Sequence, residues 1–471
     1  MHRFFTSGNW SRKAQSSLLV VLSLVSISDA HALNKQLTQL VKWETESNAV
    51  AKRSPEKILI ENYEIPLSEL QTDLAKDLDY RIKSALIFKK DDGKDYVRWI
   101  INPEDTKWFK QVESWLKAKN LSTERHHYFD AYMTASRSFV LEDPKTGYAF
   151  SGKVSTNVTG GNWKDKHFPI DDAVQIRMAT DHVNEVSGKI AFDRLKLLPE
   201  PAMFGIADID QAFGIRALGD AAEGKRYYIP AFSIMHDETS RMLAAKAGAA
   251  DVAAYWRENY NKPLAEALAE FTAHFGLTYD SGHGQNFLLE LDENMKPTGK
   301  VVLRDFADSY AQKEYLQALN WDEFLSKWDA DNIVDGHLQM SVGILHGNTP
   351  PSWMSEQEYA RYSVEFFDAY DKKFSSLTGV PVSELKKTPV TGNPGHFSYM
   401  TKTYNTKGPA WNEWRRLAHC LAGSWTARDG SPCPPNLVKQ LEGTPPAAFL
   451  KAVESGAVSC SHDVQTILKG H

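Results

Sequence analysis

Cysteine is scarce in this chain of 471 residues, which holds only Cys420, Cys433 and Cys460. Small disulfide-stapled modules contain many cysteines along a short chain, so the fold must instead depend on a hydrophobic core. The spacing of the three cysteines matches no zinc-binding pattern. In an oxidising compartment two of them could form a disulfide in the C-terminal tail, which leaves the third as a buried free thiol or an intermolecular partner.

An excess of positive charge is also missing, because 54 Lys and Arg face 60 Asp and Glu and the net charge is −6. Nucleic-acid-binding proteins present a basic surface, so we expect no nucleic-acid partner, although a local cationic pocket for a small anion remains compatible with this balance. With 42% hydrophobic residues, 28 Gly and 21 Pro, the composition is typical of a folded globular chain. These values leave a multidomain enzyme or a large binding protein.

Long hydrophobic runs are absent, and the one apolar stretch of note lies near the N-terminus between Leu18 and Ile27. It follows Arg12 and Lys13 and precedes Ala30-His31-Ala32, which resembles a signal-peptidase site. The alternative is a membrane anchor, but a bilayer span needs about 20 apolar residues. We therefore predict that residues 1–32 are a signal peptide cleaved after Ala32, that the protein is secreted or periplasmic, and that it has no stable membrane span.

The pattern of residue types changes near positions 126 and 231. Before position 126 the sequence is charged and has helical patterns, and between 126 and 231 it has β-branched and aromatic runs separated by turn residues. After 231 helical patterns occur again, on both sides of one short hairpin. We therefore predict an α+β protein with a helical N-terminal lobe, a strand-rich middle lobe and a mainly helical C-terminal lobe around a central cleft. The predicted segments after the signal peptide are 33–125 with helices at 34–50, 67–90 and 103–119, then 126–230, 231–420 and a proline-rich tail at 421–471.

An apolar stripe predicts a buried helix before the hairpin. Leu264, Leu268, Phe271 and Phe275 recur at the spacing of one helix face, and Gly276 is a typical residue to end such a helix. We expect this stripe to belong to the core.

The hairpin predicted at 287–306 places two oxygen-bearing side chains together. If Leu291 pairs with Lys300, Asn286 lies opposite Asp305 at the open end. An amide oxygen and a carboxylate can share one Mg²⁺, with phosphates as further ligands. The alternative is that Asn286 and Asp305 are ordinary cap or turn residues.

Protein and small-molecule kinases use a similar arrangement, in which an Asn precedes a β-hairpin that ends in a metal-binding Asp. Their general base is an Asp five residues before the Asn. Ser281 occupies that position in this chain, and Asp280 is displaced by one residue. The proton acceptor that a hydroxyl substrate needs is therefore not in the kinase position.

A closer resemblance is to the IucA/IucC-like family of siderophore synthetases, which do not use a nonribosomal template. His283-Gly284-Gln285-Asn286 followed by Arg304-Asp305-Phe306 is similar to the His-x-Gln-Asn and Arg-Asp-Phe motifs of that family. Upstream, Arg137-Ser138 and Lys153 resemble its Ser-x-Arg-Thr element and its lysine-bearing strand. The resemblance covers residues 130–340 approximately.

The resemblance implies an ATP-type cleft and an ATP-dependent ligase, one that adenylates a citrate-like carboxylic acid for condensation with an amine or alcohol in siderophore biosynthesis and iron acquisition. Adenylation of a carboxylate needs no general base but needs positive charge around the phosphates. The implied catalytic residues are His283, Arg137 and Lys153, the implied ATP-binding residues are Ser138, Gln285 and Arg304, and the implied magnesium ligands are Asn286 and Asp305.

The predicted export conflicts with ATP-dependent chemistry, because ATP is scarce outside the cytoplasm. Two other functions therefore remain open: an exported, non-catalytic relative that binds a carboxylate or siderophore-like ligand, and a kinase-like phosphotransferase. The sequence also leaves open whether the chain forms a homo-oligomer. His283 in a glycine-flanked turn and Asp305 at a strand end are expected to contribute little to packing.

Overall fold

The structure is a computed structural model that describes residues 33–48, 53–134, 137–160, 164–279, 284–335, 339–340, 351–354, 356–386 and 390–391. The predicted signal peptide, the three cysteines and the proline-rich tail lie outside these residues, as does His283. None of the helices in the described residues is long and apolar enough to cross a membrane.

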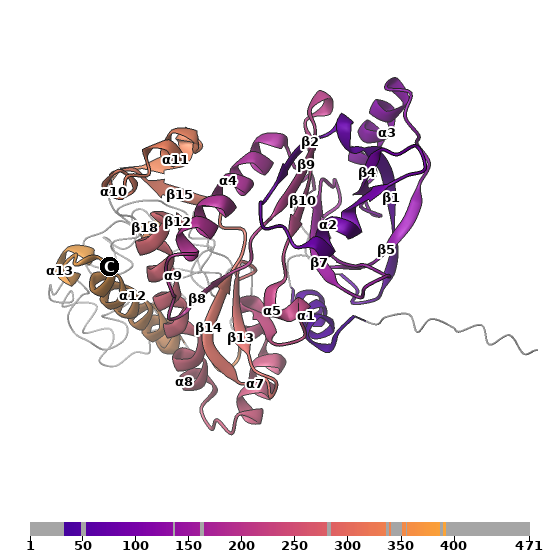
Figure 1. Cartoon of the computed structure of the whole chain (residues 1–471). Coiled ribbons are helices and arrows are strands. Elements are labelled where there is room, and N and C mark those ends of the chain that lie inside the picture. Colours follow the sequence, from indigo (N-terminus) through magenta and orange to yellow (C-terminus); the bar gives the residue numbers. More distant parts are fainter. Residues whose placement is uncertain are drawn as a thin grey trace, which may run out of the picture.

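A nine-stranded antiparallel sheet dominates one side of the molecule and most of the helices gather on the other (Figure 1), which confirms the predicted α+β class. The middle strands supply the walls of the candidate site described below. In spatial order the strands are β2 (Gln71–Leu74), β9 (Ala202–Ile206), β10 (Gln211–Arg216), β7 (Ala149–Val154), β6 (Ser138–Glu142), β5 (His126–Met133), β1 (Ile58–Pro66), β4 (Asp95–Ile100) and β3 (Ile87–Lys89).

The N-terminal segment differs from the expected helical lobe, because four of these nine strands come from residues before 126. Its helices are shorter than predicted: α1 (Lys35–Glu46), α2 (Tyr80–Leu86) and α3 (Trp108–Ala118). The charges of β1 concealed its strand character. Glu61 and Glu64 are partly exposed on opposite faces of the strand and form ion pairs with Arg125 at 2.9 Å and Lys90 at 2.6 Å. Since β1 pairs with β5, the expected boundary at 126 lies inside one sheet.

A second sheet contains the predicted hairpin. It consists of β11 (Tyr227–Pro230), β13 (Phe287–Leu291), β14 (Pro297–Leu303) and β8 (Leu195–Leu197). The predicted register was wrong, because Phe287 pairs with Leu303 and, after a bulge, Leu291 pairs with Pro297. The Asp292 side chain accepts hydrogen bonds from the backbone N–H groups of Asn294 and Lys296, both at 2.8 Å, and closes a tighter turn than expected. The bulge between Leu289 and Leu291 then sets the pairing at the open end.

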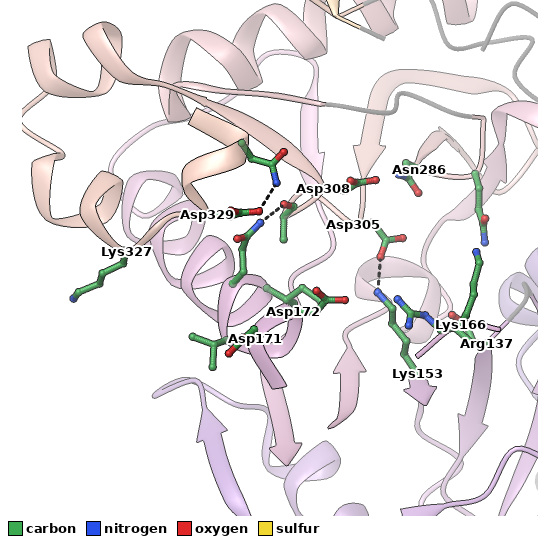
Figure 2. A pocket seen from close by; sticks show the side chains of 17 residues that line it. Arg137, Lys153, Lys166, Asp171, Asp172, Asn286, Asp305, Asp308, Lys327 and Asp329 are labelled. Carbon is green, nitrogen blue, oxygen red and sulfur yellow. Dashed lines mark hydrogen bonds and ion pairs between the residues drawn. The ribbon is translucent and has the colours of Figure 1, made fainter. Parts of the chain in front are cut away.

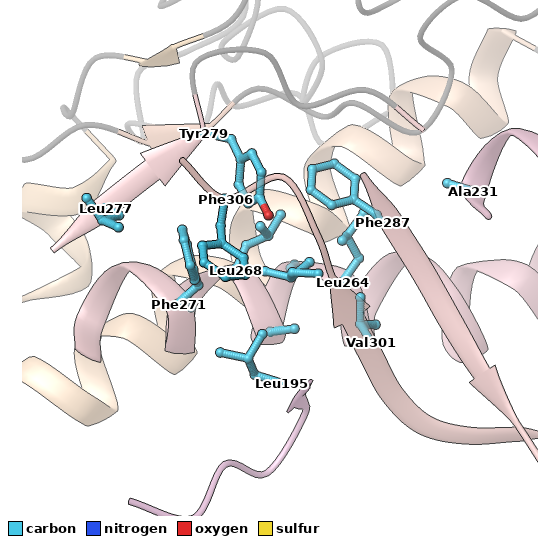
Figure 3. Packing of buried hydrophobic residues seen from close by; sticks show 14 of the residues in the cluster. Leu195, Ala231, Leu264, Leu268, Phe271, Leu277, Tyr279, Phe287, Val301 and Phe306 are labelled. Atoms are coloured by element: carbon cyan, nitrogen blue, oxygen red, sulfur yellow. The ribbon is translucent and has the colours of Figure 1, made fainter. Parts of the chain in front are cut away.

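The core of the helical side is built around α9 (Lys262–Phe275), as Figure 3 shows. The predicted stripe is confirmed, since Leu264, Leu268, Phe271 and Phe275 are at most 2% exposed. Gly276 ends the helix in the left-handed conformation at φ 64°, as a glycine does without strain. The long helix α12 (Glu356–Thr378) packs along α9.

The remaining elements complete the scaffold. α1 packs on the second sheet, α4 (Ile170–Ser187) connects the two sides, and a third sheet of β12 (Leu277–Tyr279), β15 (Ser309–Gln312) and β16 (Ile333–Val334) lies next to the hairpin. The shorter elements are α5 (Gly219–Ala222), α6 (Ala231–Ile234), α7 (Asp237–Lys246), α8 (Val252–Trp256), a π-helical turn (Arg257–Asn261), α10 (Lys313–Ala318), α11 (Asp322–Lys327), α13 (Val382–Leu385), 3₁₀ turns (Leu67–Glu69, Ala207–Ile209, Ala330–Asn332) and a ladder of β17 (Gln339–Met340) with β18 (Val390–Thr391).

One buried carboxyl group in the large sheet predicts a pH-dependent stability. Glu142 on β6 is 1% exposed, and both of its side-chain oxygens lack a hydrogen-bond partner among the described residues. Burial, with Asp130 on the neighbouring strand, raises the pKa of Glu142 from 4.5 to about 7. The folded state therefore binds a proton that the unfolded state releases, and this contribution is lost as the pH rises from about 4.5 through about 7.

We expect Glu142→Gln to raise the free energy of unfolding by about 1–2 kcal/mol at pH 8 and to change it little at pH 5. Urea denaturation at the two pH values measures the difference, with exposed Glu56→Gln as the control. An equal effect of Glu142→Gln at both pH values would contradict a protonated Glu142 in the folded state.

Candidate functional site

A cavity of about 770 Å³ opens between the large sheet, the open end of the β13–β14 hairpin and the start of α4. Of the eight site residues predicted from the sequence, Arg137, Ser138, Lys153, Gln285, Asn286 and Asp305 line it. The strand pairing of Ser138 with Lys153 brings the two upstream motifs together. The other lining residues are Lys166, Asp171, Asp172, Val174, Gln175, Ile176, Ala307, Asp308, Lys327, Asp329 and Asn332.

The end of the hairpin supplies an amide and a carboxylate to the cavity (Figure 2). Asn286 is 1% exposed, and no residue that the structure describes donates a hydrogen bond to its Oδ1 atom. In the observed register the Asn286 carbonyl accepts from the backbone N–H of Arg304 at 3.1 Å, so Asp305 lies one residue beyond the pairing. Asp305 has a left-handed φ of 56°, which turns the chain out of the strand. Both predicted metal ligands therefore reach the same cavity although the register differs.

Two cations from the large sheet hold the Asp305 carboxylate. Arg216, at the end of β10, and Lys153 on β7 both donate to Asp305 Oδ1, the latter at 3.4 Å. The guanidinium of Arg216 also donates to Glu200 Oε1 at 3.0 Å, and the side chains of Arg216 and Glu200 are only 6% and 2% exposed. Although burial alone lowers it, the pKa of Arg216 is raised above its ordinary value by the carboxylates of Asp305 and Glu200.

A further pair of cations extends this positive wall. Burial, followed by the charges of Arg137 and Lys153, lowers the pKa of Lys166, and burial likewise lowers the pKa of Arg137. Within the described ranges, neither Arg137 nor Lys166 forms an ion pair with a carboxylate. The aromatic ring of Phe168 lies 5.1 Å from both the Arg137 guanidinium and the Lys153 ammonium. Cations held this way in a partly buried wall favour an anionic ligand.

The segment that carries Lys166 is held by contacts from distant parts of the chain. Trp108 of α3 stacks on His167 with ring centroids 4.3 Å apart, and its indole N–H donates to Asp165 at 2.7 Å. The His167 carbonyl accepts a hydrogen bond from Arg137. Lys166 itself exchanges two backbone hydrogen bonds with Thr156, at 3.0 and 2.8 Å. The positions of the cations are therefore fixed by tertiary contacts.

Arg304, predicted to bind the cofactor, does not line the cavity. Its guanidinium donates to Glu44 of α1 at 2.5 Å and to the Gln285 carbonyl at 2.9 Å, and the side chains of Arg304 and Glu44 are 7% and 1% exposed. It supports the backbone next to Asn286 from behind. The physical reason is the alternation of the strand, which turns neighbouring side chains to opposite faces.

Gly284 allows two backbone segments to approach closely. A Cβ atom at this position would lie 2.9 Å from the backbone nitrogen of Phe232, and the Gly284 carbonyl accepts a hydrogen bond from that nitrogen at 3.3 Å. The glycine therefore allows the loop to approach the start of α6. His283, its neighbour, lies outside the described residues, so its predicted catalytic role stays a prediction.

The opposite wall of the cavity is acidic. Asp171 and Asp172 lie in the first turn of α4, and Asp308 and Asp329 approach from the far side with Lys327 (Figure 2). Carboxylates at a helix N-terminus are stabilised by the helix dipole. These acids were not predicted as site residues, and neither were Lys166 and Arg216. The only sequence feature that could have indicated these site residues is a charge that interrupts or ends an otherwise apolar segment.

The donor atoms present fit a Mg²⁺ ion bound together with a nucleotide. Asn286 offers a buried amide oxygen that lacks a donor, and Asp305 offers a carboxylate beside it. No group of three or more His, Cys, Asp or Glu side chains that could hold a metal occurs in the described part of the chain. The remaining positions of such an ion would therefore be filled by phosphate oxygens and water, as is usual for Mg²⁺.

No protein-family model and no curated protein matches the chain. Solved structures similar to it include ATP-bound aerobactin synthetase IucA from Klebsiella pneumoniae, at 13% identity over 70% of this chain and 60% of that chain with a TM-score of 0.43. Aerobactin synthetase IucC from the same organism matches at 12% identity over 69% and 64%, with a TM-score of 0.42. The petrobactin biosynthesis protein AsbB from Bacillus anthracis matches at 14% identity over 70% and 62%, with a TM-score of 0.46.

This chain thus spans less than two thirds of the length of each of these three proteins. Two of these three structures are aerobactin synthetases, IucA and IucC, and the sequence motifs resemble the IucA/IucC-like family.

Proposed function

We propose that the protein is an ATP-dependent carboxylate ligase, which adenylates a citrate-like carboxylic acid and condenses it with an amine or alcohol. The observation that carries this proposal is the charge of the inner wall. Three cations, Arg137, Lys153 and Lys166, line this wall beside Asp305, and the other aspartates of the cavity lie on the opposite wall. This local cluster of cations suits a phosphate or carboxylate group better than a neutral one.

Adenylation suits this set of groups because it moves no proton in its first step. A carboxylate oxygen of the acid attacks the α-phosphorus of ATP, the bond to the bridging oxygen breaks, and pyrophosphate leaves with its electrons. Negative charge accumulates on the phosphate oxygens, where Lys153, Lys166 and Arg137 can stabilise it in a partly buried site. The amine or alcohol then attacks the acyl carbon, loses a proton and displaces AMP.

The remaining residues orient these groups. Arg216, backed by Glu200, fixes the Asp305 carboxylate, and Arg304 supports the backbone that presents Asn286. A Mg²⁺ ion held by Asn286 and Asp305 would neutralise charge on the leaving pyrophosphate. Ser138 and Gln285 line the same cavity and can bind the nucleotide or the acid.

The proposal predicts exchange of labelled pyrophosphate into ATP in the presence of Mg²⁺ and a matching di- or tricarboxylate. Exchange reports the reversible adenylation alone, so the nucleophile need not be known. Formation of ADP instead would identify a kinase-like phosphotransferase. Stabilisation of the protein by citrate or a siderophore without nucleotide, together with no exchange, would identify a non-catalytic binder.

Export remains part of the proposal, and it determines which compartment must supply ATP. We expect the mature protein, recovered from a secretory or periplasmic fraction, to begin at Leu33, the residue after the predicted cleavage site. N-terminal sequencing of the purified protein measures this. A protein that retains residues 1–32 in the cytoplasmic fraction would contradict export and would remove the conflict with ATP-dependent chemistry.

A further inference from the structure

We propose that the ion pair between Lys153 and Asp305 is a latch that couples metal binding to anion binding. In the ligand-free site Lys153 forms an ion pair with the Asp305 carboxylate, which a divalent cation needs as a ligand. An anionic ligand frees this carboxylate by forming an ion pair with the Lys153 ammonium group instead. Metal and anion should therefore bind cooperatively. The inference rests on the proposed function for the identity of the anion, a nucleotide polyphosphate, but it can be tested without catalysis.

The two cations at Asp305 Oδ1 differ in a way that makes only one of them movable. Arg216 has a second carboxylate partner in Glu200, its side chain is 6% exposed, and it does not line the cavity. Lys153 makes the longer contact, at 3.4 Å, with Asp305 as its only ion-pair partner among the described residues. Its side chain is 15% exposed and lies on the cavity wall, as Figure 2 shows. Arg216 is thus a fixed clamp and Lys153 the mobile partner.

Charge determines the order of events at this carboxylate. A divalent cation that approaches Asp305 alone meets Arg216, Lys153 and the nearby Arg137, and their repulsion is strong in a partly buried site. A polyphosphate in the same cavity offers Lys153 a better partner and neutralises the wall. Each ligand then raises the affinity for the other by the same factor, as thermodynamic linkage requires.

The test compares Lys153→Met with Lys166→Met. Methionine keeps the length of the side chain and removes its charge. Both lysines line the positive wall, but only Lys153 contacts Asp305. Lys166→Met therefore controls for the loss of one positive charge from the cavity. Circular dichroism and thermal melting establish that both variants are folded.

Binding of Mn²⁺ in the absence of any nucleotide, measured by electron paramagnetic resonance, is the first readout. We expect Lys153→Met to bind Mn²⁺ about tenfold more tightly than the wild type, a factor within the range of allosteric couplings. Lys166→Met should change the Mn²⁺ affinity by less than about threefold. The second readout is the affinity for a non-hydrolysable ATP analogue, measured by calorimetry with Mg²⁺ and with EDTA. The affinity for the analogue with Mg²⁺ divided by its affinity with EDTA should be about tenfold lower in Lys153→Met than in the wild type.

Equal Mn²⁺ affinities of the wild type and Lys153→Met would overturn the latch, and so would an equal gain in the two variants, which would reflect the general field of the cavity. A protein that binds no Mn²⁺ in any form would overturn the metal site as well. These binding results do not depend on whether the protein is a ligase. A latch that behaves as expected, together with no pyrophosphate exchange for any acid, would leave the coupling intact and reject the ligase.

Discussion

Asp305→Asn is expected to lower pyrophosphate exchange by at least about 10²-fold, the usual scale for the loss of one transition-state contact. The substitution removes the charge that would hold a metal ion and that holds Lys153 in place. It also weakens the clamp, because the buried Arg216 keeps only Glu200 as a charged partner. We therefore expect the free energy of unfolding to fall by about 1–3 kcal/mol. The sequence alone suggested that Asp305 contributes little to the fold.

The exposed carboxylate of Asp77 provides the matched control, since Asp77→Asn changes the same functional group at a residue that does not line the cavity. This control should alter both quantities little. Exchange assays and urea denaturation on the same preparations separate the two effects. Wild-type exchange by a folded Asp305→Asn protein would show that the chemistry takes place elsewhere. Wild-type stability would show that Arg216 does not depend on Asp305.

Arg304→Ala is expected to destabilise the protein by about 3–5 kcal/mol, the largest effect on stability among the substitutions considered. The change leaves the carboxylate of Glu44 without its partner, although this side chain is only 1% exposed and its Oε2 atom already lacks a hydrogen bond. An unpaired charge at such a position costs more than the pair contributes. The Gln285 carbonyl loses a donor as well.

The double variant Glu44→Met with Arg304→Met tests this explanation, because two apolar side chains of similar length replace a buried ion pair at little or no cost. We expect most of the stability lost in Arg304→Ala to return in the double variant, as urea denaturation would measure. If the double variant is as unstable as Arg304→Ala, the contact with the Gln285 carbonyl, and not the ion pair, carries the stability.

Local features of the sequence predicted the local elements well. The stripe of α9, its end at Gly276 and the existence of the β13–β14 hairpin depend on helix periodicity and turn residues within short segments. The motif resemblance also named six residues that line one cavity. These predictions succeeded because each rests on neighbours along the chain, which the sequence shows directly.

The register of the hairpin shows how small a difference local reasoning misses. Asn286 and Asp305 reach the same cavity, but the pairing is offset by one residue, and the left-handed conformation of Asp305 compensates for the offset. The side-chain hydrogen bonds of Asp292 decide the length of the turn. Such a competition between similar turns has no clear signature in the order of the residues.

Other features were decided only by the tertiary structure. Of the N-terminal strands, β4 and β3 join the large sheet through β1, whereas β2 pairs with β9 at the other edge. The charges of β1 are paired by side chains from segments outside the strand. Arg216 and Lys166 belong to the candidate site because Glu200, Asp305 and Trp108 approach from distant parts of the chain. Antiparallel pairing joins segments at any separation along the sequence. A buried charge is stable only where another side chain forms an ion pair or a hydrogen bond with it. The sequence therefore determined α9 and the hairpin, whereas the packing of the elements determined the N-terminal strands and which charges face the cavity.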